Sequence, residues 1–310
     1  MQIKTVKGLL TQRLRSCKRG QHVGVTAALN RGGRLCFELK GRMQIVTVST
    51  KDSFTYEGIY WPGAAANPKL GAVFVHGWTG GYDPKGRYRG FVGNNVTVAA
   101  SMLAGVGISS LSAVNRGYHA PEFFNDSSYD IDAYIDFLVS QGCEKILLLG
   151  HSLGGAKCAY YGGEVGHPQL GGVVLMSAIP TTYNFEGKEG LLEQAQAMIA
   201  AGNGHLPIAR KEGETITTYE PVTLMKNFHE TYRGTTLDAV KKIKLPLLSF
   251  AAQGEWSWFH EVTKGIIAMK LNSSMMEAVM LPGIDSHGYE GHENEVTGHI
   301  LRWIERNFPS

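Results

Sequence analysis

Apolar runs alternate with amphipathic segments along most of the chain. Short, continuously apolar stretches are typical of buried parallel strands, and they occur at 70–77, 106–115, 145–150, 171–179, 245–254 and 275–283. Segments with helical spacing of apolar residues lie between or after them, at 96–104, 127–142, 260–270 and 293–307. Strands that alternate with helices predict right-handed βαβ units and a mostly parallel sheet.

Local signals add a strand pair and a helix start. Residues 44–50 and 54–62 predict two antiparallel strands joined by a turn at Lys51–Asp52. The helix expected at 127–142 begins with two serines, and we expect Ser127 or Ser128 to be its N-cap.

The alternation stops between residues 181 and 240. This segment contains helical patches at 190–202 and 221–232, separated by polar and glycine-containing turns, and no clear strand. We therefore predict a helical insertion between two strands of one sheet.

Composition limits the class of protein. A chain of 310 residues, 43% apolar and 18% charged, is long enough for one large α/β domain with an inserted subdomain. No apolar stretch approaches the roughly 20 residues that span a bilayer, so we expect no stable membrane insertion, and no secretory signal follows Met1. The four cysteines lack CxxC spacing and disulfide-scaffold density, so we expect reduced thiols and a cytoplasmic location.

Positive charge is concentrated at the start of the chain. Residues 1–42 hold ten Lys or Arg residues against one acid, Glu38. We expect residues 1–43 to form a basic surface extension; an organelle-targeting segment and a nucleic-acid patch are the alternatives. No aromatic residues are interleaved to stack bases, so we expect no nucleic-acid partner.

A serine lies at a point where a strand is expected to turn into a helix. Gly150-His151-Ser152-Leu153-Gly154 fits the pattern G-x-S-x-G, in which a sharp turn exposes a nucleophilic serine above the sheet. The alternative role for Ser152 is a helix N-cap. The strand–turn–helix context favours the nucleophile.

A serine nucleophile needs a histidine base and an acid that orients it. Of eleven histidines, His287 lies in the loop just after the last apolar strand, where it can reach back over the edge of the sheet. The acid is expected after the strand at 245–254, which indicates Glu255, with Glu261 and Asp285 as alternatives. His292 and His299 fall at or within the last helix and are expected at the surface.

Two backbone N–H groups must stabilise the oxyanion of acyl transfer. We expect them from Leu153, directly after the nucleophile, and from Trp78, in the glycine-rich loop after the strand at 70–77. The chain offers no second histidine for an H-E-x-x-H zinc site and no G-x-G-x-x-G that opens a helix. We therefore expect no metal and no cofactor.

These motifs together resemble those of the α/β-hydrolase superfamily. "HGWTGG", "NRGYH", "GHSLGG", the acid at Glu255 and "PGIDSHGYEGHE" occur in that superfamily's order, over about residues 44–308. The resemblance implies a mostly parallel eight-stranded sheet flanked by helices, with an antiparallel second strand. It also implies a core of residues 44–180 and 241–310, and a helical cap at 181–240, inserted after strand six.

The resemblance places Ser152, His287 and Glu255 in the catalytic triad, and Trp78 and Leu153 in the oxyanion hole. This sequence departs from the usual pattern of the superfamily in two ways: the acid is Glu rather than Asp, and Ala252 stands where glycine is usual. The expected function is a serine hydrolase that cleaves a carboxylic ester of a small or medium-sized, partly apolar molecule through an acyl-enzyme.

Several alternatives remain open at this point. The same triad serves amide, thioester and C–C bond hydrolases, and some members of the fold bind ligands without catalysis. The substrate is expected to contact the cap at 181–240 and the loop at 79–90. Apolar residues of the cap either line a substrate pocket or join the cap to the sheet; they are Leu191, Leu192, Met198, Ile199, Leu224, Met225 and Phe228.

Overall fold

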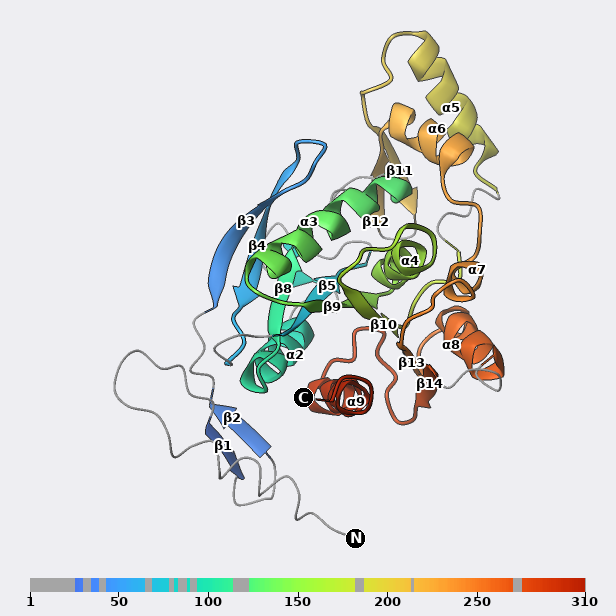
Figure 1. Ribbon diagram of the computed structural model, residues 1–310. Coiled ribbons are helices and arrows are strands. Elements are labelled where there is room, and N and C mark those ends of the chain that lie inside the picture. Colours follow the sequence, from blue (N-terminus) through green and yellow to red (C-terminus); the bar gives the residue numbers. More distant parts are fainter. Residues whose placement is uncertain are drawn as a thin grey trace. The chain divides into compact units, whose positions relative to one another are not determined.

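An eight-stranded sheet runs through the unit Arg42–Ser310 of the computed structural model (Figure 1). Across the sheet the strands lie in the order β3-β4-β8-β5-β9-β10-β13-β14. β4 is antiparallel to both of its neighbours, and the other pairs of this sheet are parallel. The predicted mostly parallel sheet with an antiparallel second strand is confirmed. Its strands are β3 (Gln44–Ser49), β4 (Thr55–Trp61), β5 (Leu70–Val75), β8 (Ser109–Ala113), β9 (Lys145–His151), β10 (Leu170–Met176), β13 (Leu247–Ala252) and β14 (Met276–Leu281).

The basic start of the chain belongs to a separate unit, Met1–Gly41. Within it, β1 (Thr26–Leu29) pairs with β2 (Leu35–Glu38) in antiparallel register. The structure describes residues 26–29, 35–38, 43–64, 69–77, 81–82, 88–89, 94–113, 123–181, 187–212, 215–269 and 275–309.

Helices cover both faces of the eight-stranded sheet (Figure 1). One face carries α2 and α9, and the other carries α3, α4, α7 and α8. This arrangement buries both sides of the parallel strands, as their continuous apolar runs require. The helices are α2 (Asn94–Gly105), α3 (Ser127–Ser140), α4 (Leu153–Tyr160), α7 (Thr236–Val240), α8 (Ser257–Met269) and α9 (Glu293–Asn307); two short turns, η1 (Phe124–Asp126) and η2 (Tyr161–Val165), adjoin α3 and α4.

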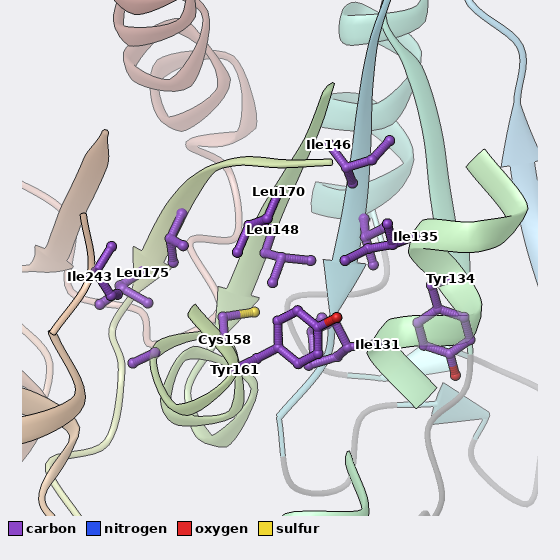
Figure 2. Close-up of a cluster of buried hydrophobic side chains, with 14 of the residues drawn as sticks. Ile131, Tyr134, Ile135, Ile146, Leu148, Cys158, Tyr161, Leu170, Leu175 and Ile243 are labelled. Carbon is purple, nitrogen blue, oxygen red and sulfur yellow. The ribbon is translucent and has the colours of Figure 1, made fainter. Parts of the chain in front are cut away.

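Successive residues of the central strands enter the two different cores. In β9, Leu148 packs on the α3 and α4 side, whereas Leu147 and Leu149 pack on the α2 and α9 side. Figure 2 shows Leu148 in the same cluster as Ile135 of α3 and Cys158 of α4. The strict alternation follows from the two-residue period of a strand.

The segment between β10 and β13 holds more than helices. Its long helices, α5 (Glu189–Ala200) and α6 (Pro221–Glu230), pack together, but an antiparallel pair, β11 (Ile208–Glu212) and β12 (Thr215–Tyr219), separates them in the chain. The prediction that this region contains no strand is therefore wrong. Ile208 and Tyr219, at the ends of the two strands, pair in register and are both buried. The strand sequences, IARKE and TITTY, show little apolar alternation.

Six of the seven apolar residues expected to line a pocket or to join this segment to the sheet form a core of the segment itself. The seventh, Ile199, is 39% exposed. Among the described residues, α5 and α6 bury their facing side chains against Ile208 and Tyr219. This cluster contains Leu191, Leu192, Ala195, Leu224 and Met225, with Met198 and Phe228 packed against it.

The start of α3 also differs from expectation. The helix begins at Ser127, and the residue before it, Asp126, already has helical dihedral angles because the turn η1 leads directly into α3. Ser128 Oγ donates 2.9 Å to the carbonyl of Asn125 rather than accepting from the helix N–H groups. The prediction of a serine N-cap is therefore wrong.

Cys143 and Cys158 are free, buried thiols, and burial raises the pKa of Cys143 to about 11.

Within the part of the chain that the structure describes, every helix is too short or too polar to cross a membrane.

Truncating the fully buried Leu148 should strongly destabilise the fold. We expect Leu148→Ala to lower the free energy of unfolding by about 2–5 kcal/mol, because it leaves a cavity between β9, α3 and α4. Ile45→Ala, at a position 79% exposed on β3, should change it by less than about 0.5 kcal/mol. Urea denaturation of both variants measures the difference, and equal losses would contradict the described core.

Candidate active site

Ser152 occupies a strained turn between β9 and α4. Its backbone has φ 56° and ψ −121°, a combination that side-chain-bearing residues rarely adopt. Its N–H donates 2.9 Å to the carbonyl of Met176, at the end of the neighbouring strand β10. The side chain is half-buried, so the hydroxyl stands at the edge of the sheet as the G-x-S-x-G pattern predicts.

The two glycines of the pattern make this turn possible through close contacts. A Cβ added at Gly150 would lie 2.3 Å from the carbonyl oxygen of Gly154. A Cβ added at Gly154 would lie 2.1 Å from the carbonyl oxygen of Val75 in β5. No side chain fits at either distance, so α4 packs against β9 and β5 only with glycine at both positions.

One of the two predicted oxyanion donors, Leu153, lies at the start of α4. Leu153 is the first residue of α4, and the first N–H groups of a helix have no partner within it. Across from it, His76 is buried at the end of β5, and its Nδ1–H donates 2.8 Å to the carbonyl of Gly77. Trp78, the other predicted oxyanion donor, lies outside the described residues, as do 79–80, 83–87 and 90 of the loop at 79–90.

His287 and Glu255 form a hydrogen-bonded pair. His287 Nδ1 lies 2.6 Å from Glu255 Oε2, although the two residues come from loops after β14 and β13. Because a carboxylate only accepts, Nδ1 carries the proton, and in the neutral ring Nε2 is then the acceptor. The imidazole is thus held in the tautomer that a general base requires.

The Glu255 carboxylate is dry but well supplied with donors. Its side chain is 1% exposed, against 34% for His287. Its other oxygen, Oε1, accepts from Ser177 Oγ at 2.5 Å and from the Ala252 N–H at 3.0 Å. Ala252 takes the place where glycine is usual, and its backbone N–H binds the acid.

The other carboxylates considered for the acid position lie elsewhere. Glu261 and Asp285 are both exposed, whereas Glu255 is buried and bonded to His287. His292 and His299, expected at the surface, are only partly exposed: His292 directly precedes α9 and His299 lies within it.

Sequence reasoning missed the role of His151 within the pattern. His151 is buried directly before Ser152, and its Nε2–H donates 2.8 Å to the backbone carbonyl of His287. Their ring centroids are 4.5 Å apart. Burial, and then the neighbouring His287, lowers the pKa of His151 to about 3, so this ring is neutral at neutral pH. The residue ties the His287 loop to the Ser152 turn.

Aromatic side chains on the other side of His287 were also missed. The ring of Phe259, in α8, stacks on the imidazole with centroids 3.8 Å apart and planes 29° from parallel. Trp256 stacks on Phe259 at 6.4 Å and is 80% exposed. The sequence "GEWSWFHE" carries the signal, since three of the four residues after the acid are aromatic, but nothing in it indicates a contact with His287.

The strand order and the turn at Ser152 define an α/β-hydrolase fold. The model of the alpha/beta hydrolase family matches residues 72–260, which is more than half of the sequence and includes Ser152 and Glu255. The chain therefore belongs to the alpha/beta hydrolase family, and this membership supports hydrolase activity.

Solved structures share the fold at low sequence identity. GrgF, an alpha/beta hydrolase from Penicillium sp. sh18, is 15% identical with a TM-score of 0.68, over 87% of this chain and 100% of that one. Est1E from Butyrivibrio proteoclasticus is 15% identical with a TM-score of 0.58, over 86% and 99%. A monoglyceride lipase from Saccharomyces cerevisiae is 14% identical with a TM-score of 0.57, over 87% and 96%. A comparison with curated proteins gives no match.

The low pKa of His151 predicts how stability depends on pH. The unfolded chain binds a proton on His151 below about pH 6.5, whereas the folded chain does not bind it until the pH falls to about 3. The contribution of His151 to the free energy of unfolding is therefore complete above pH 6.5 and is lost as the pH falls. The loss between pH 7 and pH 5 is about 2 kcal/mol.

We expect His151→Gln, whose amide still donates to the carbonyl of His287, to lose less stability than the wild type over this range. Urea denaturation at pH 7 and pH 5 measures the difference. His205→Gln is the control, because the side chain of His205 is 82% exposed. A wild-type slope in the His151→Gln variant would show that the histidine is not the group responsible.

Proposed function

We propose that the protein is a serine hydrolase that cleaves carboxylic esters, with Ser152 as nucleophile, His287 as general base and Glu255 as the orienting acid. The observation that carries the proposal is the 2.6 Å bond from His287 Nδ1 to Glu255, next to the strained turn at Ser152. The bond from His151 to the backbone of His287 supports it, because His151 directly precedes the nucleophile.

In the first half of the reaction, Ser152 Oγ attacks the ester carbonyl carbon and its proton passes to Nε2 of His287. The imidazolium that forms is stabilised by the adjacent carboxylate of Glu255. Collapse of the tetrahedral intermediate breaks the ester C–O bond, and His287 returns its proton to the departing alcohol.

The developing oxyanion is stabilised by backbone N–H groups. Leu153 supplies one from the start of α4, and we propose Trp78 for the other on the basis of its place in the sequence. A donor of this kind is typically worth about 3–4 kcal/mol in the transition state. In the second half, His287 activates a water molecule that attacks the acyl-enzyme, releases the carboxylic acid and restores Ser152.

The surroundings of His287 favour a substrate with an apolar part. Phe259 presents its ring beside the imidazole, and Trp256 extends this aromatic surface into solvent. Because this aromatic surface is continuous and borders His287, it suits contact with an apolar ligand group. We therefore propose that the acyl or alcohol part of the ester lies against Trp256.

Labelling by a fluorophosphonate probe tests the nucleophile and the acid. We expect the wild type to be labelled at Ser152 and the Ser152→Ala variant not to be labelled. Glu255→Gln should slow p-nitrophenyl ester hydrolysis by about 10³–10⁴-fold, since the amide favours the wrong imidazole tautomer.

Two matched variants make this experiment decisive. Glu261→Gln and Asp285→Asn remove the same charge from exposed carboxylates and should retain hydrolysis within about twofold, as surface changes do. An intact protein that resists the probe would overturn the proposed function. Activity that survives Glu255→Gln but not one of the other two would overturn the assignment of the acid.

A chain-length series tests the proposed contact with Trp256. We expect Trp256→Ala to lower kcat/KM about threefold to tenfold for octanoate esters, because the chain loses apolar contact area, and to leave acetate esters nearly unchanged. Ile45→Ala, which removes an exposed apolar side chain from β3, is the control. An equal effect on both esters would contradict a role in binding the chain.

A further inference from the structure

We infer that Tyr289 and Ser177 are positioning residues that form a hydrogen-bonded relay behind Glu255, in which Tyr289 donates to Ser177 and Ser177 donates to Glu255. The relay keeps the Glu255–His287 pair in the form in which His287 can accept a proton. The inference rests on the proposed function, because it assigns a task to residues that support the proposed acid. The phenol of Tyr289 bonds to Ser177 Oγ, and Ser177 Oγ lies 2.5 Å from Glu255 Oε1.

Both residues are fixed in unusual backbone conformations. Ser177 directly follows β10 with φ 44°, and its N–H donates 2.8 Å to the carbonyl of Phe250 in β13. Tyr289 has φ 59° in the loop after β14, and its ring packs edge-on against Phe250. Both are fully buried. Residues held in such conformations persist only where the surrounding structure holds them in place.

Counting protons sets the direction of the relay. A serine hydroxyl has one proton, and the ionised Glu255 carboxylate can only accept. Ser177 therefore donates to Glu255, and its oxygen accepts from Tyr289. The Phe250 carbonyl lies 3.4 Å from the same phenol oxygen. Burial, and then the charge of Glu255, raises the pKa of Tyr289, so the phenol keeps its proton.

Water cannot easily replace the Ser177 hydroxyl as a donor to Glu255, because the Glu255 side chain is 1% exposed. The two other donors to the carboxylate, Ala252 N–H and His287 Nδ1–H, are already in use. A buried carboxylate that loses a donor retains the cost of its desolvation. The relay therefore stabilises the negative charge of the buried Glu255 carboxylate.

Other titratable groups lie around the Glu255–His287 pair. His151, at the end of β9, is neutral, and Tyr289 is protonated. His260 of α8 donates to the carbonyl of Ala252 on the far side of the acid. Asp285 is exposed on the His287 loop.

The relay acts on the charge of the pair. With neutral imidazole the pair carries one negative charge, and with imidazolium it carries none. Donors on Glu255 stabilise the charged state more, so they favour the form in which His287 can accept a proton. Removing a donor should therefore move the acid limb of the pH–rate profile to higher pH.

The test compares Ser177→Ala and Tyr289→Phe with the wild type. We expect each to move the acid limb of fluorophosphonate labelling and ester hydrolysis upward by about one pH unit, and so to slow reaction on that limb about tenfold. The His287 Nδ1 proton resonance, followed by NMR, should shift its titration midpoint in the same direction. Ser177→Gly removes the same hydroxyl while relieving the positive φ, and should match Ser177→Ala.

The chain offers a matched control for the loss of a buried Tyr–Ser bond. Tyr60 of β4 bonds to Ser109 of β8 at 3.2 Å, on strands other than those that carry the proposed triad. Tyr60→Phe should therefore lower stability comparably and leave the acid limb unmoved.

Unmoved acid limbs and NMR midpoints in the Ser177 and Tyr289 variants would overturn the inference. So would an activity that Ser177→Gly restores, because backbone strain rather than the hydroxyl would then be responsible. A wild type that is not labelled at Ser152, with an NMR midpoint that still moves, would overturn the proposed function and leave the relay standing.

Discussion

The tight contact between the first turn of α4 and strands β9 and β5 is the constraint on which the site depends. Gly150 and Gly154 allow the chain to reverse within one residue, and that residue, Ser152, takes a positive φ as a consequence. The same contact fixes the start of α4, which is the positive end of the helix dipole, directly after the serine. A looser turn would displace both groups at once.

Parallel strands bring the other groups to the same place. Ser152, Ser177, Glu255 and His287 follow β9, β10, β13 and β14, which are consecutive neighbours in the sheet. The carboxyl ends of parallel strands meet at one edge, where such folds place their ligands. Ser152 and Ser177 have positive φ, and each is held by a backbone bond to the end of the next strand. The sheet thus supplies the rigidity that these strained residues require.

The sequence allowed the centre of the sheet to be predicted because β5, β9, β10 and β13 are buried on both faces and form continuous apolar runs. The pairing of His287 with Glu255 followed from the order of motifs, although several acids were available. The hairpin β11–β12 was missed because its strands show little apolar alternation, although Ile208 and Tyr219 at their ends form a buried pair. The bonds of His151 and the relay through Ser177 join residues more than 70 positions apart, and local patterns carry no information about such contacts.

Two sets of hydrogen-bond donors act at different stages of the proposed reaction. Donors on Glu255 stabilise the resting state, in which the negative charge lies on the carboxylate and the imidazole is neutral. When Ser152 attacks, its proton moves to His287 and the negative charge appears on the substrate oxygen, near the start of α4. The net charge of the site stays the same while its location changes. A preorganised site therefore needs fixed dipoles at both places, and only those at the oxyanion gain strength in the transition state. Under the proposed mechanism, the donors behind Glu255 determine the pH range in which His287 acts, and the N–H groups at the start of α4 lower the barrier.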